Sequence, residues 1–158
     1  MPLATLMDTA INSIKKGRYL AHGNDGIIYV INPEVVLKVH NGGYHGTPQK
    51  SAQHEFALGT ELYQQRVQVP QYLELFTARL PTMDYFGVFM QRIKGVEPSS
   101  LSLSSLTEAQ RQYAEQKKLI DQLGYKMSAD SKTVYSNALF DQKKRKLFLY
   151  DLVQWKRK

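Results

Sequence analysis

The fold is decided by residues 18–39, which read RYLAHGNDGIIYVINPEVVLKV. Two runs in this stretch, 27–31 and 35–39, are rich in β-branched and aromatic residues, which favour strands. The residues at 23–26 form a tight-turn signal of the kind that joins hairpin strands, and Asn32 with Pro33 interrupts the chain again. With 18–22 as a first strand, the pattern predicts an antiparallel meander whose last strand carries a lysine, Lys38.

The residues on either side extend this meander. A loop over 41–48 leads to a helix predicted over 51–65, and the apolar runs 69–76 and 85–90 predict two more strands. Residues 1–14 carry apolar side chains at helical spacing, which predicts a short amphipathic helix. Residues 1–95 are therefore expected to form a first lobe with a five-stranded antiparallel sheet and a helix that follows its third strand.

Residues 96–158 are predicted to form a second, smaller lobe. A Ser-rich connector over 97–105 precedes Thr107, a favourable N-cap residue, and Gln110 completes a capping-box pattern. The helix is expected to end near residue 123, with Gly124 as its C-terminal cap. A loop over 125–134 and two strands, 137–140 and 146–150, joined by a basic turn, complete an α+β chain.

Composition narrows the classes of protein that the chain could represent. Hydrophobic residues make up 42% and charged residues 22% of the 158 residues, which is typical of a globular protein. The chain has no cysteine, so it has neither disulfides nor thiolate metal sites. No apolar run is long enough to span a membrane, and the start lacks the features of a signal peptide. We expect a cytoplasmic protein, or one secreted into a host cell without a cleavable signal peptide.

The net charge of +7 is compatible with one further class of protein, the nucleic-acid-binding domains. A basic surface can bind nucleic acid. The clearest clusters, 143–146 and 156–158, fall in a predicted turn and at a terminus, so solubilising charge is the preferred interpretation. A basic nucleic-acid-binding domain remains an alternative.

Two charged residues stand where a strand is otherwise apolar. Lys38 lies inside an apolar run, and a buried lysine is costly without a partner; an edge strand with the lysine facing solvent is the alternative. Asp151 closes the apolar run 147–150, where a carboxylate is unexpected unless it has a task. These residues are the first candidates for a functional site.

The order of elements, with these residues in place, resembles the protein-kinase-like superfamily, and in particular minimal bacterial effector kinases that lack an activation segment and most of the C-lobe. The resemblance covers residues 17–155. It implies a minimal protein-kinase-like fold, with a nucleotide-binding N-lobe and a truncated C-lobe. It also implies ATP and Mg²⁺ as cofactors, and a protein substrate or an activating partner protein.

The resemblance assigns the residues that would hold the nucleotide. Lys38 resembles the lysine that pairs with the α- and β-phosphates, with Glu55 as its preferred partner and Glu61 as the competitor. The turn after His22 would be the phosphate loop, and the run 88–95 would be the hinge that meets adenine. The implied nucleotide-binding residues are Gly23, Asn24, Gly26, Lys38, Met90, Gln91 and Ile93.

The resemblance also assigns the residues that would bind the metal and take part in phosphoryl transfer. Asn137 and Asp151 would hold Mg²⁺ through oxygen ligands. Asp130 would accept the proton of the substrate hydroxyl or position that hydroxyl, and Lys132 would lie near the γ-phosphate.

The sequence departs from the family pattern at several points. Ser128 stands in place of the catalytic-loop histidine, Val153 replaces the glycine that follows the metal-binding aspartate, and Asp130 precedes Asn137 by two residues more than usual. Only part of the glycine pattern is present in the loop at 23–26. These departures leave two hypotheses within this fold: an active protein kinase, or a pseudokinase that acts as a nucleotide-binding or protein-interaction module.

Overall fold

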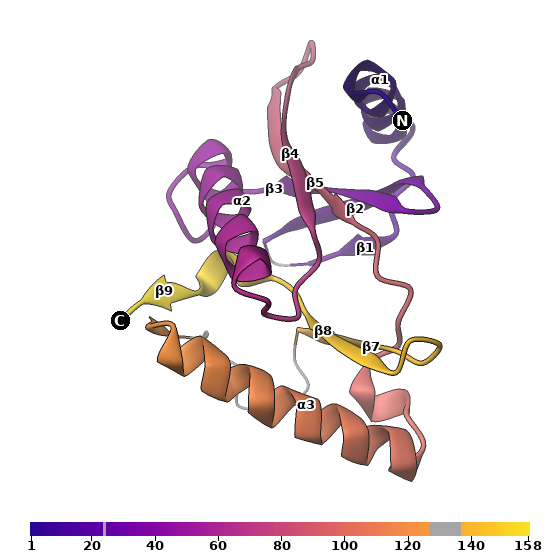
Figure 1. Ribbon diagram of the computed structural model, residues 1–158. Helices are drawn as coiled ribbons and strands as arrows, with labels where there is room; N and C mark the ends of the chain where they lie inside the picture. Colours follow the sequence, from indigo (N-terminus) through magenta and orange to yellow (C-terminus); the bar gives the residue numbers. More distant parts are fainter. Residues whose placement is uncertain (24, 127–136) are drawn as a thin grey trace. The chain divides into compact units, whose positions relative to one another are not determined.

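The computed structural model describes residues 1–23, 25–126 and 137–158. Within these residues the protein is α+β, with a five-stranded antiparallel sheet and three α-helices (Figure 1). The chain divides into two compact units. The first comprises Met1–Thr60 and Gln71–Arg92, and the second comprises Glu61–Pro70 and Ile93–Lys158. The lobe boundary predicted after residue 95 lies close to the division at Arg92, but the assignment of Glu61–Pro70 to the second unit was not foreseen.

The first unit is built on the five-stranded sheet, whose strand order is β1-β2-β3-β5-β4. Every neighbouring pair is antiparallel. The strands are β1 (Ala21–His22), β2 (Gly26–Asn32), β3 (Val35–His40), β4 (Tyr72–Arg79) and β5 (Asp84–Gln91). Because β3 lies between β2 and β5, Lys38 is in an interior strand, and the alternative of an edge-strand lysine is wrong.

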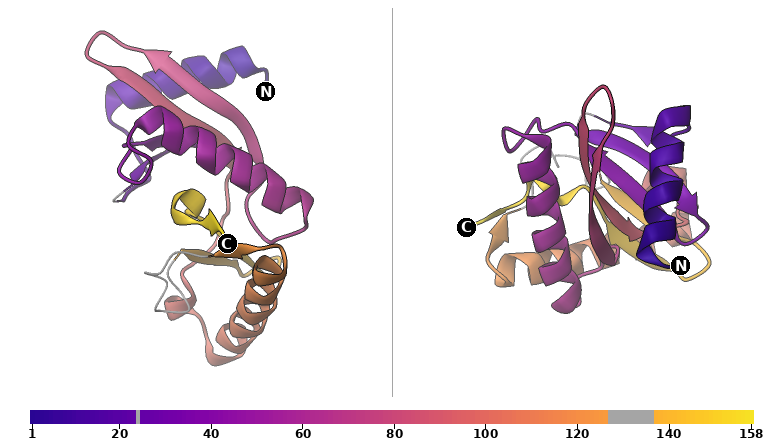
Figure 2. Two further views of the ribbon diagram at one scale, coloured as in Figure 1. Left: turned by 90° about the vertical axis from the view of Figure 1, so that its left-hand side faces the viewer. Right: turned by 90° about the horizontal axis from the view of Figure 1, so that it is seen from above.

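Helix α1 (Leu3–Lys16) packs on one side of this sheet (Figure 2). Its buried residues Leu6, Ala10 and Ile14 lie at helical spacing and so face one way. They join a core of sheet residues that includes Leu37 and Val39, alternate positions of β3 that point to the same face.

Helix α2 (Pro48–Gln64) lies on the opposite side of the sheet (Figure 1). Lys38, between Leu37 and Val39, points to this side and contacts Glu55 of the helix. The alternation along β3 therefore separates an apolar α1 side from an α2 side that carries buried charge.

The second unit is assembled around helix α3 (Leu103–Gln122) and the hairpin of β7 (Ala138–Asp141) and β8 (Lys146–Leu149) (Figure 1). Gln112 of α3 ties the two together. Its Nε2 donates to the carbonyl of Arg145 at 2.9 Å, and its Oε1 accepts from the N–H of Leu147 at 2.8 Å. The remaining elements are the short pair β6 (Tyr125–Lys126) and β9 (Lys156–Arg157), and the 3₁₀ turns η1 (Pro98–Ser100) and η2 (Leu152–Gln154).

Two element boundaries differ from the prediction for identifiable reasons. Helix α3 begins at Leu103 with Ser102 at the N-cap, so the capping box at Thr107 is wrong. The Thr107 hydroxyl instead donates to the carbonyl of Leu103 at 2.9 Å, a bond to the preceding turn that serine and threonine make inside helices. Gly124 does follow the end of the helix with a positive φ of 82°, as predicted.

Strand β4 begins at Tyr72 rather than at residue 69. Pro70 has no N–H to give to a sheet ladder. The residue before Val69, Gln68, is engaged in the second unit, where its carbonyl accepts from Leu149 at 2.7 Å and its N–H donates to Gln116 at 2.7 Å. The strand can start only after this segment. The first strand, predicted over 18–22, is also shorter and comprises Ala21–His22.

Candidate functional site

Lys38 and Glu55 form a buried ion pair in the first unit. The Lys38 Nζ lies 2.8 Å from Glu55 Oε2, and the two side chains are 6% and 0% exposed. The carboxylate preferred from the sequence is therefore the one that meets the lysine. Glu61, the competitor, belongs to the second unit and pairs there with Arg157 at 2.9 Å.

Glu55 accepts hydrogen bonds from three side chains, and this determines its ionisation. The donors are Lys38, the His40 Nε2 at 2.6 Å and the Tyr72 hydroxyl at 3.1 Å. Burial alone would raise the pKa of Glu55, but the charge of Lys38 and the hydrogen bonds from His40 and Lys38 outweigh it. They lower the pKa from 4.5 to about 2. Glu55 is therefore a fixed negative charge inside the first unit.

Gly59 allows Tyr72 to reach Glu55. Residues 55 and 59 are one turn apart on the same face of α2. A Cβ at Gly59 would lie 2.2 Å from Cε2 of the Tyr72 ring, so a larger residue would displace the ring. The small residue lets the ring of β4 pack directly on the helix, with its hydroxyl directed at the carboxylate.

Asp25 provides a second carboxylate for Lys38. Its Oδ2 lies 3.0 Å from the Lys38 Nζ, and its side chain is 9% exposed. Asp25 belongs to the turn between β1 and β2, where the phosphate loop was predicted. The next residue, Gly26, could carry no Cβ, because that atom would lie 2.2 Å from the carbonyl oxygen of Val39. The ammonium of Lys38 is therefore held between a helix carboxylate and a loop carboxylate.

The strand predicted to contain the hinge is β5. Met90 is buried and lies opposite Val36, on the same face of the sheet as Lys38. The N–H of Gln91 donates to the carbonyl of Gln71 at 2.8 Å, so this N–H is already engaged and does not face an adenine edge. The other predicted hinge residue, Ile93, belongs to the second unit, whose longer segment begins there.

The second unit holds Asn137 and Asp151, the predicted metal ligands, at the open end of one hairpin. Asn137 directly precedes β7, and Asp151 follows β8 after one intervening residue, Tyr150. The N–H of Tyr150 donates to the carbonyl of Asn137 at 3.0 Å, which keeps the two ends of the hairpin together. Both residues have left-handed backbones, with φ of 65° at Asn137 and 66° at Asp151.

Left-handed backbone conformations at residues other than glycine are strained, although asparagine and aspartate tolerate them best. Such strain persists where the surrounding structure imposes it, and it concentrates at functional sites. Two oxygen-bearing side chains in this conformation, at the same end of a hairpin, give the donor types that Mg²⁺ prefers. The described residues contain no group of three or more His, Cys, Asp and Glu that could hold a metal ion.

Asn24, Asp130 and Lys132 lie outside the described residues. The roles assigned to them from the sequence, one in the phosphate loop and two in transfer, therefore remain predictions.

Three residues of the buried cluster were not anticipated: Asp25, His40 and Tyr72. His40 could have been found, because it lies two residues after Lys38 and so shares its face of the strand. Asp25 could have been considered as a charge in a turn that leads back to β3. Tyr72 gave no signal, since its reach to Glu55 depends on the close approach at Gly59.

Comparisons with known proteins do not assign the chain to a family. No protein-family model matches the chain, and no curated protein is significantly similar to it. Among the described residues, no helix is both long enough and apolar enough to pass through a bilayer.

Proposed function

We propose that this protein is an ATP- and Mg²⁺-dependent phosphotransferase, a minimal protein kinase that modifies Ser, Thr or Tyr on a partner protein. The observation that carries the proposal is the buried pair of Lys38 and Glu55 on the α2 side of an antiparallel sheet. A buried ion pair is weak evidence for stability, because desolvation offsets most of its attraction. An oriented, fully charged ammonium is what a phosphate-binding site requires.

In this proposal Lys38 contacts the phosphates and Glu55 fixes its position. The three donors on Glu55 keep the carboxylate ionised, and its negative charge at 2.8 Å favours the ammonium form of Lys38. Ile28 lies opposite Lys38 on β2 and is half-buried, and Val30 lies opposite Val36. These apolar side chains share the Lys38 face and offer a surface for the flat face of adenine.

Asn137 and Asp151 are the proposed Mg²⁺ ligands. Mg²⁺ is commonly held by one or two carboxylates together with substrate phosphates and water, and an amide oxygen with a carboxylate suits that pattern. When bound, the ion would neutralise charge on the phosphates. The part played by the chain is to hold both oxygen donors at one end of the β7–β8 hairpin.

The proposed reaction moves the γ-phosphoryl group from ATP to a protein hydroxyl. The bond from this group to the β-phosphate oxygen breaks, a bond to the hydroxyl oxygen forms, and ADP leaves. We assign the hydroxyl proton to Asp130, and we place Lys132 near the transferred group, as the resemblance implies.

Asp25 supports an alternative, a pseudokinase that binds nucleotide without transferring phosphoryl, or binds none, and acts through protein contacts. Its carboxylate lies on Lys38 in the turn that would otherwise cradle phosphates. Like charges repel, so an ionised Asp25 would oppose a phosphate at Lys38. In an active enzyme the nucleotide must displace this carboxylate from the ammonium.

Incubation with γ-labelled ATP and Mg²⁺, alone and with a host-cell lysate, tests the proposal. We expect transfer of label that is lost in Lys38→Met and in Asp151→Ala. Lys50→Met is the matched control, because Lys50 is an exposed lysine in the same unit, and it should retain activity. No transfer under any condition, with nucleotide still bound, would favour the pseudokinase.

Asp25→Asn tests whether the Asp25 carboxylate competes with a phosphate for the ammonium of Lys38. If Asp25 competes with phosphate, the variant binds ATP more tightly than the wild-type protein. A loss of ATP binding in a folded Asp25→Asn variant would show that Asp25 supports the site instead.

A further inference from the structure

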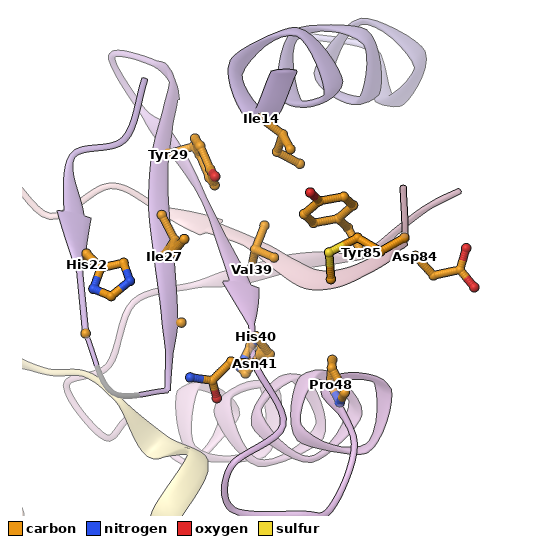
Figure 3. Close-up of a pocket in the computed structure, with 13 residues that line it drawn as sticks. Ile14, His22, Ile27, Tyr29, Val39, His40, Asn41, Pro48, Asp84 and Tyr85 are labelled. Atoms are coloured by element: carbon orange, nitrogen blue, oxygen red, sulfur yellow. The ribbon is translucent and has the colours of Figure 1, made fainter. Parts of the chain in front are cut away.

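Positive charge gathers in the second unit. Its ranges contain 14 Lys and Arg against 8 Asp and Glu, a net charge of +6, whereas those of the first unit contain 7 against 6. Figure 3 shows a pocket of the first unit, where Ile14, Tyr29 and Tyr85 extend toward one space, and the described residues that line it include no lysine or arginine. An acidic macromolecule is therefore attracted mainly to the second unit.

The densest run of cations in this unit lies at the turn between β7 and β8 (Figure 1). This run, called here the basic turn, consists of four consecutive exposed residues, Lys143, Lys144, Arg145 and Lys146. The Lys146 Nζ lies 5.2 Å from the centroid of the Phe148 ring. Among the described residues, no carboxylate lies within ion-pairing distance of any of the four side chains.

The basic turn differs in this respect from other cations of the unit. Arg111 pairs with Glu108 at 2.6 Å on α3, and Arg157 pairs with Glu61 at 2.9 Å. A carboxylate of the chain thus offsets each of these charges at contact distance. The charge of the basic turn is not offset in this way and is available to a partner.

Buried polar groups fix the backbone of the basic turn. The Asp141 side chain accepts from the N–H of Lys144 at 2.9 Å, and Asp141 is only 7% exposed. From α3, the buried Gln112 engages the carbonyl of Arg145 with one end of its amide and the N–H of Leu147 with the other. Charge that serves only solubility needs no fixed backbone, so these contacts indicate a more specific role.

The conformation of Arg145 supports the same conclusion. Its φ of 50° is left-handed, which is unfavourable for a residue with a Cβ. Glycine would remove this cost but would also remove a cation from the basic turn. Backbone strain of this kind concentrates at functional sites. A turn held in one conformation loses less entropy on binding, and so it gains affinity for a partner that fits it.

The chemistry of the basic turn favours an acidic peptide over other polyanions. Single-stranded nucleic acid stacks on aromatic side chains, and a bilayer takes up apolar ones. Residues 141–146 read DQKKRK and contain neither. A nucleic-acid duplex buries about 1,000 Å² or more of a protein, which exceeds what one turn offers. A short acidic segment requires only cations gathered at one place.

We propose that the basic turn is a docking site for an acidic segment of a partner protein, whose Asp and Glu side chains pair with Lys143, Lys144 and Arg145. Docking uses no nucleotide, so it goes beyond the proposed phosphoryl transfer and applies to an active kinase and to a pseudokinase alike.

An NMR titration of the whole protein with hexaglutamate, without nucleotide, tests the proposal. We expect saturable shifts of the backbone N–H signals of the basic turn at about 0.01 M salt. They should disappear at about 1 M salt, because the screening length falls from about 30 Å to about 3 Å. Hexaglutamine, which has the same length without the charge, should cause no shift. An oligothymidylate of equal charge should bind no more tightly than hexaglutamate, since it finds no ring to stack on.

Two double variants locate the site, because they remove the same charge from different places. One combines Lys143→Gln with Lys144→Gln, and the other combines Lys117→Gln with Lys118→Gln, at two adjacent exposed lysines of α3 in the same unit. The first should bind hexaglutamate about two- to thirtyfold more weakly than the wild type, the ratio that two exposed ion pairs provide. The second should bind it as the wild type does.

Two substitutions of Asp141 test the fixed backbone. Asp141→Ala and Asp141→Asn both remove one negative charge, but only asparagine keeps an oxygen that can accept from the N–H of Lys144. Asp141→Ala should therefore bind hexaglutamate about twofold or more weakly than Asp141→Asn. Should Asp141→Ala not fold, exchange of the Lys144 N–H with solvent in the wild type decides instead. Protection supports the fixed turn, and rapid exchange contradicts it.

Three results would overturn the docking proposal: no shift at the basic turn with saturating hexaglutamate at low salt, equal loss of affinity in the two double variants, or tighter binding of the oligothymidylate. Equal affinities of folded Asp141→Ala and Asp141→Asn would overturn the role of the fixed backbone. If hexaglutamate binds as expected while no label is transferred from ATP, the proposed function fails and the docking site stands.

Discussion

Glu55→Gln should remove stability that depends on pH in a calculable way. The pKa of Glu55 falls from 4.5 to about 2 on folding. Each pKa unit corresponds to about 1.4 kcal/mol, so the drop of about 2.5 units means that the ionised carboxylate contributes about 3 kcal/mol to the free energy of unfolding at pH 7. The magnitude agrees with the ~3–5 kcal/mol commonly lost when one partner of a buried ion pair is removed. We therefore expect Glu55→Gln to lower the free energy of unfolding by about 3 kcal/mol at pH 7.

The sign of the pH dependence follows from the direction of the pKa change. A carboxyl group whose pKa is lower in the folded protein stabilises it fully above the unfolded value. That stability is lost as pH falls toward the folded value. The gap between wild type and Glu55→Gln should narrow from about 3 kcal/mol at pH 7 to about 2 kcal/mol at pH 3.5.

Urea unfolding at a series of pH values, followed by circular dichroism, measures this gap. Glu61→Gln is the matched control, because Glu61 lies in the same helix with a side chain that is 41% exposed. It should change stability little at any pH. Equal stabilities of wild type and Glu55→Gln, or a gap that does not change with pH, would show that Glu55 is not held as a buried anion.

Three further predictions concern individual contacts. Gly59→Ala should destabilise the protein by about 1–3 kcal/mol in thermal or urea unfolding, since the new Cβ overlaps the ring of Tyr72; unchanged stability would mean that the ring is free to move. Arg145→Gly should raise stability by about 1 kcal/mol by relieving its left-handed backbone and should leave ATP binding unchanged, whereas Asp151→Gly should abolish Mg²⁺-dependent ATP binding; a loss of stability in Arg145→Gly would contradict the strain argued for this backbone conformation. Gln112→Leu should cost about 1–3 kcal/mol in urea unfolding, because it leaves a buried N–H and a carbonyl of the β7–β8 hairpin without their side-chain partner, and a neutral result would mean that water replaces it.

The sequence predicted the parts of the fold that depend on local pattern. The strands at 27–31 and 35–39 follow from β-branched runs, and the five-stranded antiparallel sheet was predicted from such runs along the chain. The interior position of Lys38 was left open, because the place of β3 between β2 and β5 is a property of the assembled sheet. The beginning of α3 was missed because the residues before it, a serine-rich run, are typical of connectors, and the helix starts within them at Leu103. The start of β4 was missed because Gln68, just before it, is hydrogen-bonded to Leu149 and Gln116 within the second unit, and no local pattern reveals these bonds.

Of the candidate site, only the pairing of the strand lysine with a helix carboxylate could be predicted from the sequence. A lysine inside an apolar strand requires a buried carboxylate, and the following helix supplied one. The other partners depend on long-range geometry. Asp25 reaches Lys38 because β2 and β3 pair with Gly26 opposite His40, and Tyr72 reaches Glu55 because a glycine lets β4 approach α2. Register and close approach of this kind are set by the assembled sheet rather than by the neighbours in sequence.

The most direct test of the proposed function is equilibrium binding of ATP, with and without Mg²⁺, measured by calorimetry on the wild-type protein and on folded Lys38→Met and Asp151→Ala. We expect saturable binding by the wild-type protein that is strengthened by Mg²⁺. Lys38→Met should lose it altogether, and Asp151→Ala should lose only the contribution of Mg²⁺. Absence of binding by the wild-type protein, or binding that neither substitution changes, would contradict the assignment of Lys38 to phosphate and of Asp151 to the metal.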